Sequence, residues 1–330
     1  MTAATAKKRV FSGIQPSGEM HLGNYLGAIK NWVEGQHEND NIFCIVDWHA
    51  ITVPQDPAAL HRRSRELAMI YIAAGLDPKS TAIFIQSHVK EHAELAWLFN
   101  CITPMGWANR MTQFKEKSAE TKERSSVGLL AYPMLMAADI LLYQTDGVPV
   151  GEDQRQHIEL TRDIAQTFNH HYGEVFKVPE AWIRKEGARI MSLQDPLKKM
   201  SKSDPAGCVF LLDPPDTIRQ RIMRAVTDSG REVRFDEQRP GLFNLLTIYR
   251  LFSGLSREQI EDRFAGRGYG DLKRELADLV IEGLSALQAE FARLAADPSY
   301  VEGVLKESAD RIRPMAQATM AAANQAMGLG

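Results

Sequence analysis

The stretch RVFSGIQPSGEMHLGNYLGA (residues 9–28) combines a strand pattern, a glycine-rich turn and the start of a helix. Residues 9–14 form a short β-prone run, and the apolar residues of 23–36 recur at helical spacing. Two glycines five residues apart lie in the turn, as in a phosphate-binding loop, but Glu19 and Met20 then replace the Lys and Ser/Thr of that loop. Any lysine that contacts a phosphate here must therefore come from elsewhere in the chain.

Strands and helices alternate after this stretch. Residues 41–47 and 81–87 are almost entirely apolar, as strands are when both faces of a parallel sheet are covered. Between them, residues 57–76 read as a helix with Pro57 at its start and Gly75 near its end. The order predicts an α/β fold, a Rossmann-like doubly wound parallel sheet. Such sheets bind ligands at the carboxyl ends of their strands, which is where the glycine-rich turn lies.

The rest of the chain is predicted to be mainly helical. A short extended segment is expected at 145–151 and a loop at 187–205, and no strand pattern follows residue 213. We therefore predict two domains, an α/β domain at 1–213 with a helical insertion and an all-helical domain at 214–330 whose last helix returns to the first domain. The expected helices are 106–126, 128–143, 152–169 and, at the C-terminus, about 307–328.

The composition is that of an ordinary soluble globular protein. The chain has 330 residues, 44% of them hydrophobic and 25% charged, and a formal net charge of -3, so no overall basic field indicates nucleic acid. It has no signal peptide and no apolar run that could span a bilayer. Its three cysteines form no CxxC pair, which argues against disulfides and structural zinc and fits a cytoplasmic location.

The segment KKMSKS (198–203) is a candidate phosphate-binding loop. Lysines supply positive charge on flexible stems, and serines supply small hydrogen-bond donors. Such a loop can close over a polyphosphate and neutralise charge while a bond to phosphorus breaks. A solvated surface loop is the alternative interpretation of the same residues.

Two further patterns have both a functional and a structural interpretation. HVKEH (88–92) matches a short zinc pattern with His88 and His92 on one helix face, but the chain offers no persuasive third ligand, and two polar residues at the start of a helix explain it equally well. Asp139 lies in the apolar run MLMAADILLY, and a buried carboxylate is costly unless it is paired. It is either a helix-face residue that caps a neighbouring backbone group or a ligand-binding acceptor in an apolar pocket.

HLGN (21–24) resembles the first signature of the class I aminoacyl-tRNA synthetases, His-Ile-Gly-His, and KMSKS (199–203) matches the second. Asn24 stands where the class pattern has its last His, and Asn can donate a hydrogen bond but cannot become cationic. Together with FCIVDWHAIT, MTQFKEKSA, YPMLMAADILLYQTDGVPVGEDQRQHIELTRDIA and GARIMSLQDP, these motifs resemble the bacterial tryptophanyl-tRNA synthetases over nearly the whole chain.

The resemblance implies a tryptophan–tRNA ligase that uses ATP with Mg²⁺. Tryptophan and ATP would form an adenylate and pyrophosphate, and tryptophan would then pass to tRNA(Trp). No covalent enzyme nucleophile is needed, so catalysis depends on positioning and on charge stabilisation. The implied catalytic residues are His21, Asn24, Lys117, Lys199 and Lys202. The implied ATP contacts are Gln15, Pro16, Ser17, Gly23, Asn24, Gly151, Glu152, Asp153, Ile190, Lys199, Met200, Ser201, Lys202 and Ser203.

Tryptophan recognition follows from the chemistry of indole, whose N–H can only donate a hydrogen bond. An ionised carboxylate in an apolar slot is its best partner, and the resemblance assigns this role to Asp139. Phenylalanine would leave that carboxylate unpaired, which favours discrimination. The implied tryptophan contacts are Phe11, Gln15, Tyr132, Met136, Asp139, Val148, Val150 and Gln154, with Tyr132 and Gln154 at the ammonium group. His49 and His157 are expected to be structural, and no residue is assigned to a metal.

The resemblance also implies partners. The domain at 214–330 would bind the anticodon, and the protein would be a homodimer whose tRNA spans both subunits; no membrane partner is expected. The apolar segment 128–143 could form either the dimer interface or the core. Three alternatives remain at this point: a tyrosyl-tRNA synthetase, a small nucleotidylyltransferase that does not use tRNA, and an inactive relative with a binding or regulatory role.

Overall fold

The computed structural model describes residues 7–111, 126–183 and 189–330. The centre of this part of the chain is a five-stranded sheet with the order β3-β2-β1-β4-β5, and all neighbouring strands are parallel. Because β2 lies on one side of β1 and β4 on the other, the direction of winding reverses at β1, and the predicted doubly wound sheet is confirmed. The strands are β1 (Arg9–Ile14), β2 (Asp40–Ile45), β3 (Ala82–Ile85), β4 (Gly147–Val150) and β5 (Glu180–Ile183).

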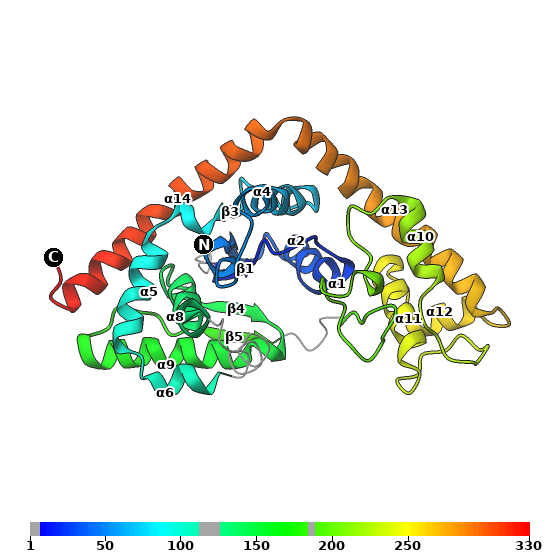
Figure 1. Cartoon of the computed structure of the whole chain (residues 1–330), viewed down its shortest axis with the longest axis horizontal. Coiled ribbons are helices and arrows are strands. Elements are labelled where there is room, and N and C mark those ends of the chain that lie inside the picture. Colours follow the sequence, from blue (N-terminus) through cyan, green and yellow to red (C-terminus); the bar gives the residue numbers. More distant parts are fainter. Residues whose placement is uncertain (1–6, 112–125, 184–188) are drawn as a thin grey trace, which may run out of the picture.

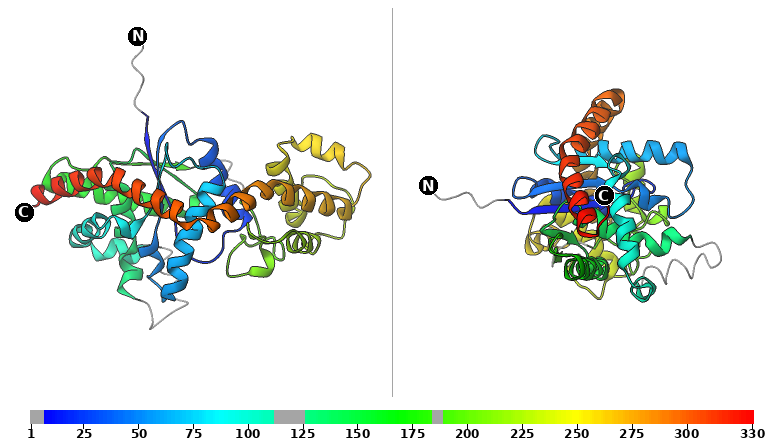
Figure 2. Two further views of the ribbon diagram at one scale, coloured as in Figure 1. Left: turned by 90° about the horizontal axis from the view of Figure 1, so that it is seen from above. Right: turned by 90° about the vertical axis from the view of Figure 1, so that its left-hand side faces the viewer.

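Helices cover both faces of the sheet because successive residues of the inner strands are apolar and point to opposite faces. Phe43 of β2 packs on Trp32, which contacts Tyr71 on the same face. Ile42 belongs to a second cluster with Leu141 on the other face. Figures 1 and 2 show helices on both sides of the sheet. The helical elements of this part are α1 (Leu22–Asn24), η1 (Tyr25–Ile29), α2 (Lys30–Glu34), α3 (Asp47–Ala50), α4 (Pro57–Ala73), η2 (Gln86–His88), α5 (Glu91–Ile102), α6 (Met105–Arg110), α8 (Val127–Leu141), η4 (Glu152–Gln154) and α9 (Arg155–Tyr172).

The C-terminal part is helical and reaches back to the sheet. α13 packs on α10, α11 and α4, and α14 then runs along β3, α4 and α5. In Figure 1 these two long helices meet at an angle above the sheet. The segment expected as the last helix, 307–328, is the C-terminal part of α14, which begins at Pro298. The elements are η5 (Pro205–Gly207), α10 (Pro215–Met223), α11 (Pro240–Ser253), α12 (Arg257–Arg263), α13 (Tyr269–Ala296) and α14 (Pro298–Ala326).

Two predictions about helices are wrong in detail. The helix expected at 23–36 contains the π-turn η1, where the side chain of Asn31 lies 3.3 Å from the carbonyl oxygen of Leu26. Residues 225–239, expected to be helical, have no regular structure. Asp228 instead holds this segment as a loop, because its carboxylate accepts from the backbone N–H of Gly230 and from the side chain of Arg239.

The other differences concern short elements. The edge strand β5 was not predicted, because four residues without a buried side chain form no recognisable pattern. The predicted helix 106–126 begins as α6, and its residues 112–125 lie outside the described chain. His88 belongs to the 3₁₀ turn η2, whereas His92 lies in α5, so the expectation that they share a helix face is wrong.

Candidate active site

The glycine-rich turn lies against residues 190–203, which we call the lysine hairpin. Gly18 has a φ of 73°, and a Cβ built on it would lie 3.2 Å from Cδ of Lys202. The Lys202 ammonium donates a hydrogen bond to the carbonyl oxygen of Ser17 at 2.5 Å. A Cβ on Gly23 would likewise lie 3.6 Å from Cβ of Met200. The two segments, remote in sequence, therefore form one surface at the carboxyl end of β1.

The cations of the lysine hairpin differ in environment. Burial, with a smaller contribution from Arg63, lowers the pKa of Lys202 to about 8. Lys199 is exposed, and so are Ser201 and Ser203, whose hydroxyls lie 2.9 Å apart. The hairpin thus offers Lys202, held against the turn, and Lys199, in solvent, to an anion above the turn, while its third lysine, Lys198, pairs with Asp195.

His21, at the start of α1, is a neutral imidazole. It is buried, and burial lowers its pKa to about 4, with further lowering by Lys202 and Lys199. Its Nδ1 has no hydrogen-bond partner among the described residues. The ring lies 3.0 Å from the position that a Cβ on Gly23 would occupy, so the glycine makes room for it. With a pKa of about 4, the imidazole of His21 carries no charge at pH 7, a point on which the sequence was silent.

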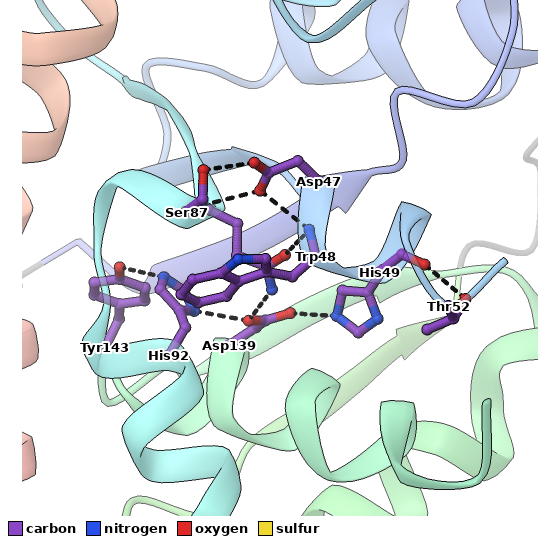
Figure 3. A network of polar contacts seen from close by, with 9 residues as sticks. Asp47, Trp48, His49, Thr52, Ser87, His92, Asp139 and Tyr143 are labelled. Carbon is purple, nitrogen blue, oxygen red and sulfur yellow. Dashed lines mark hydrogen bonds and ion pairs between the residues drawn. The ribbon is translucent and has the colours of Figure 1, made fainter. Parts of the chain in front are cut away.

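Asp139 of α8 is buried, with 1% of its surface exposed. Figure 3 shows it between the rings of His92 and His49. Its Oδ1 accepts hydrogen bonds from Nε2 of Gln86 at 2.6 Å and from Nδ1 of His92 at 2.7 Å. Its Oδ2 lies 2.8 Å from Nε2 of His49. The other ring nitrogen of His92 lies 2.8 Å from the hydroxyl of Tyr143. Asp139 is thus paired with three side chains, not alone in an apolar slot as expected.

These contacts keep the carboxylate of Asp139 ionised. Burial acts to raise its pKa, but the hydrogen bonds from His49 and His92 outweigh burial and hold the pKa below its usual value. A carboxylate oxygen can accept two hydrogen bonds. Oδ1 already accepts two, whereas Oδ2 contacts His49 alone among the described residues, so Oδ2 has capacity for one further donor.

One face of α8 carries the other candidates for an amino-acid site. Tyr132, Met136 and Asp139 follow one another at helical spacing. The hydroxyl of Tyr132 lies 2.7 Å from Nε2 of His157, and burial raises the pKa of Tyr132 to about 12. The centroids of the Tyr132 and His49 rings lie 6.3 Å apart in an edge-on arrangement. The apolar candidates Phe11 and Val148 are buried in the cluster on this face, and Met136 and Val150 pack against it. The bulk of α8 is therefore core.

The segment after β4 lies at the same edge of the sheet. Gly151 precedes η4, which contains Glu152, Asp153 and Gln154. Glu152 is exposed and pairs with Arg155. Because β4 neighbours β1, this segment and the glycine-rich turn flank the point where the winding reverses, which is where open α/β sheets bind ligands.

A cleft of ≈ 180 Å³ lies on the α4 side of the glycine-rich turn. Gln15 and Pro16 line it, together with Arg63, Glu66 and Phe291. The other implied ATP contacts do not line this cleft, but Gly18, which lies against Lys202, does, so the cleft adjoins the surface shared with the lysine hairpin.

Comparison with known proteins identifies the family. The model of the family described as tRNA synthetases class I (W and Y) matches residues 3–285. The chain belongs to this family. A tryptophan–tRNA ligase of Wolinella succinogenes is 56% identical over 325 residues, 98% of this chain and 99% of the relative.

Crystal structures agree with the fold of the synthetase. Tryptophanyl-tRNA synthetase of Mycoplasma pneumoniae has a TM-score of 0.90 at 36% identity and covers 98% of each chain. The enzyme of Campylobacter jejuni complexed with ADP and tryptophan has a TM-score of 0.86 at 36% identity, over 97% of this chain and 100% of its own. The sequence predictions of family, enzyme class and fold are confirmed.

In this synthetase the described site residues that the sequence predicts fall into three groups. One lies between the glycine-rich turn and the lysine hairpin, one lies around α8, and one follows β4 at Gly151 and η4. Lys117 falls outside the described residues. Ile190 and Met200 are buried within the lysine hairpin.

Sequence reasoning missed Gln86 and His92 as partners of Asp139. A signal existed for both: Gln86 is a polar residue directly after a buried strand, and His92 was noticed as part of a zinc pattern. Both nitrogens of His92 are engaged by Asp139 and Tyr143, so the ring has none left for a metal. The described residues hold no group of three or more His, Cys, Asp or Glu side chains suited to a metal, and no described helix is long and apolar enough to cross a membrane.

Proposed function

We propose that the synthetase is a tryptophan–tRNA ligase, which activates L-tryptophan with ATP to tryptophanyl-adenylate and pyrophosphate and then transfers tryptophan to tRNA(Trp). The observation that carries this proposal is Asp139, an ionised carboxylate buried among side chains with one acceptor position left on Oδ2. An indole N–H is a donor of matching chemistry. Relatives named tryptophan–tRNA ligase, at 50–57% identity over nearly the full length, support tryptophan over tyrosine.

The amino acid binds along α8. Asp139 accepts the indole N–H, and Phe11, Met136, Val148 and Val150 surround the rings. Tyr132 and Gln154 receive the ammonium group, and the raised pKa of Tyr132 keeps its hydroxyl protonated. The tryptophan carboxylate then points toward the carboxyl end of β1, where Gln15 lies.

ATP binds over the glycine-rich turn. Gly18 and Gly23 let the nucleotide approach the backbone, and neutral His21 and Asn24 offer hydrogen bonds to phosphate without adding charge. The tryptophan carboxylate attacks the α-phosphorus, and the negative charge moves to the departing pyrophosphate. Lys199, Lys202 and Lys117 stabilise that charge, and Ser201 and Ser203 donate hydrogen bonds. The remaining contacts to the nucleotide are Pro16, Ser17, Gly151, Glu152, Asp153, Ile190 and Met200.

Mg²⁺ accompanies ATP in this proposal. The described residues build no carboxylate cage for it, so the ion would be held by phosphates and water, as Mg²⁺ commonly is. It would neutralise part of the phosphate charge. We assign no protein ligand to it and derive no step through it.

The partners are tRNA and a second copy of the chain. The helical part from residue 214 binds the anticodon, and the adenylate passes its aminoacyl group to the terminal ribose.

Large apolar side chains are exposed on α8 and on α5 and α6, which both pack on α8: Trp97 is 66%, Met105 65% and Val127 81% exposed. These side chains support a homodimer interface there. A Trp97→Glu variant that sediments as the wild type does would contradict this interface. The proposed enzyme works in the cytoplasm.

The deciding experiment is pyrophosphate exchange into ATP with each amino acid, followed by charging of tRNA. Exchange that depends on tryptophan, followed by tryptophan transfer to tRNA(Trp), is the expected result. Exchange that depends on tyrosine, or that needs no amino acid, would overturn the proposal.

A further inference from the structure

The lysine hairpin is held from the side that faces away from the glycine-rich turn. Within the hairpin, the backbone N–H of Met200 donates to the carbonyl of Ile190 at 3.0 Å, and that of Ser192 donates to the carbonyl of Lys198 at 2.8 Å. Neighbouring residues of an extended strand direct their backbone groups to opposite sides. The N–H and C=O of Met191 therefore point outward and need a partner from elsewhere.

Asn244 of α11 supplies both partners. Its Oδ1 accepts from the N–H of Met191 at 2.9 Å, and its Nδ2 donates to the carbonyl of Met191 at 2.9 Å. Asn244 is 3% exposed, so these bonds are shielded from water. An asparagine side chain has one acceptor and one pair of donors, which match the two groups of a single backbone residue.

α11 and the loop before it make further contacts with the same strand. The N–H of Val226 donates to the carbonyl of Leu193 at 2.7 Å. A Cβ on Gly241 would lie 2.4 Å from the carbonyl oxygen of Val226, so α11 and this loop are in close contact. Ile190 and Met200 lie in the same buried cluster as apolar residues of α11.

The other end of α11 touches the helix that follows the glycine-rich turn. The Lys30 ammonium donates to the carbonyl of Leu251 at 2.5 Å, and the rings of Tyr25 and Phe252 lie 6.5 Å apart. One helix thus contacts both the lysine hairpin and the segment after the turn. The distance between these two segments decides where the ammonium groups stand relative to the phosphates.

We propose that Asn244 is a positioning residue for adenylate formation. By bonding to Met191, it fixes the distance between the lysine hairpin and the glycine-rich turn. The inference rests on the proposed role of Lys199 and Lys202 toward pyrophosphate. Asn244 touches no reacting atom and acts through the backbone that carries these lysines. Its loss should therefore affect ATP turnover and leave the tryptophan site around Asp139 unchanged.

The test compares Asn244→Ala with Asn169→Ala. Asn169 is a matched control, because it is also a buried asparagine that holds backbone, accepting from the N–H groups of Val175 and Phe176 and donating to the carbonyl of Phe176. It lies at the C-terminal end of α9, remote in sequence from the lysine hairpin. Both variants should lose thermal stability to a similar extent.

In tryptophan-dependent pyrophosphate exchange, Asn244→Ala should lower kcat/KM for ATP at least about tenfold, a moderate effect for misplaced charge stabilisation. The Kd for tryptophan should stay within about twofold, and Asn169→Ala should change neither quantity by more than that. Hydrogen exchange of peptides from 190–203 should accelerate in Asn244→Ala alone. Unchanged kcat/KM for ATP, or equal losses in ATP turnover and tryptophan binding, would overturn the inference.

Two further variants complete the design. Lys202→Ala is measured alongside: if it does not slow exchange, the proposed role of the lysines fails, whereas if it slows exchange and Asn244→Ala does not, only the present inference fails. Should Asn244→Ala not fold, Asn244→Asp undergoes the same assays. This variant keeps the acceptor for Met191 but loses the donor, and it should reduce kcat/KM for ATP while tryptophan binding is kept.

Discussion

Asp139 illustrates how single residues acquire a function through their neighbours. An isolated carboxylate in an apolar interior would become protonated, because burial disfavours the charged form. Donors from α3, η2 and α5 prevent this, so Asp139 is ionised although only 1% of its surface is exposed. The charge that the proposed recognition of indole requires is therefore maintained by His49, Gln86 and His92.

The first prediction concerns this selectivity. Asp139→Ala should reduce the ratio of kcat/KM for tryptophan to that for phenylalanine by at least about 100-fold, because a site built to bind a donor rejects a ligand that lacks it. Amino-acid-dependent pyrophosphate exchange measures the ratio. Asp47→Ala is the control, since Asp47 bonds to Ser87 and to the N–H of Trp48 and, within the described part of the chain, makes no direct hydrogen bond to Asp139; the ratio should stay within about twofold. An unchanged ratio in Asp139→Ala would show that Asp139 does not contribute to the recognition of tryptophan.

The second prediction concerns the pH dependence of ATP turnover. The pKa of Lys202 is about 8, so the free enzyme loses this positive charge as the pH rises through 8. Because kcat/KM reports the free enzyme, kcat/KM for ATP at saturating tryptophan should fall above pH 8, approaching about tenfold per pH unit. In Lys202→Arg the guanidinium stays charged, and the decline should disappear even if the absolute rate is lower. The same decline in both proteins would assign it to another group.

At the scale of elements, glycines mark where two segments approach each other most closely. Gly18 is needed for two reasons, its φ of 73° and the stem of Lys202 beside it. Gly241 is needed because the backbone of residue 226 leaves no space for a side chain. The first contact joins two segments far apart in sequence, whereas the second joins α11 to the loop before it, whose Val226 bonds to Leu193 of the lysine hairpin.

A third prediction compares two glycines in helices. Gly241→Ala should lower the free energy of unfolding by about 2–3 kcal/mol, because its Cβ would meet a carbonyl oxygen that cannot move without the main chain. Gly303→Ala in α14, where a Cβ would meet nothing within 4 Å, should instead raise stability by about 0.5–1 kcal/mol. Urea unfolding measures both. Equal effects of the two changes would contradict the close contact at Gly241.

At the scale of the whole molecule, two apolar clusters hold the sheet and the helical part together. The cluster on the first face continues from α4 through the segment around Leu211 to α11 and α13, so apolar packing joins the two domains that we predict on either side of residue 213. α14 closes the second face, and Arg311 donates to the carbonyl oxygens of Pro78, Lys79 and Thr81. The C-terminal helix is thus part of the α/β core.

A fourth prediction tests this role of α14. Ala316 is fully buried in the second cluster, whereas Ala321 on the same helix is exposed. Ala316→Asp would bury an unpaired charge and should cost more than about 3 kcal/mol, while Ala321→Asp should stay within about 0.5 kcal/mol. Thermal or urea unfolding distinguishes them. A tolerated Ala316→Asp would show that α14 does not need to pack on the sheet.

The order of strands and helices in the α/β part, and the segments that we propose to carry the chemistry, can be predicted from the sequence alone. Both are local properties: apolar periodicity extends over a few residues, and the motifs around His21, Asp139 and Lys202 are contiguous. Local patterns failed where structure depends on distant contacts, as in the edge strand β5 and in residues 225–239.

Which residues contact one another, and which of them are charged, depends on the tertiary structure. The partners of Asp139 come from three different elements, and the contact of Asn244 with Met191 joins residues 53 positions apart. The neutral state of His21 and the lowered pKa of Lys202 depend mainly on burial, which exists only after packing. These distances cannot be predicted from the spacing of the residues in the sequence, because they arise only when the chain folds.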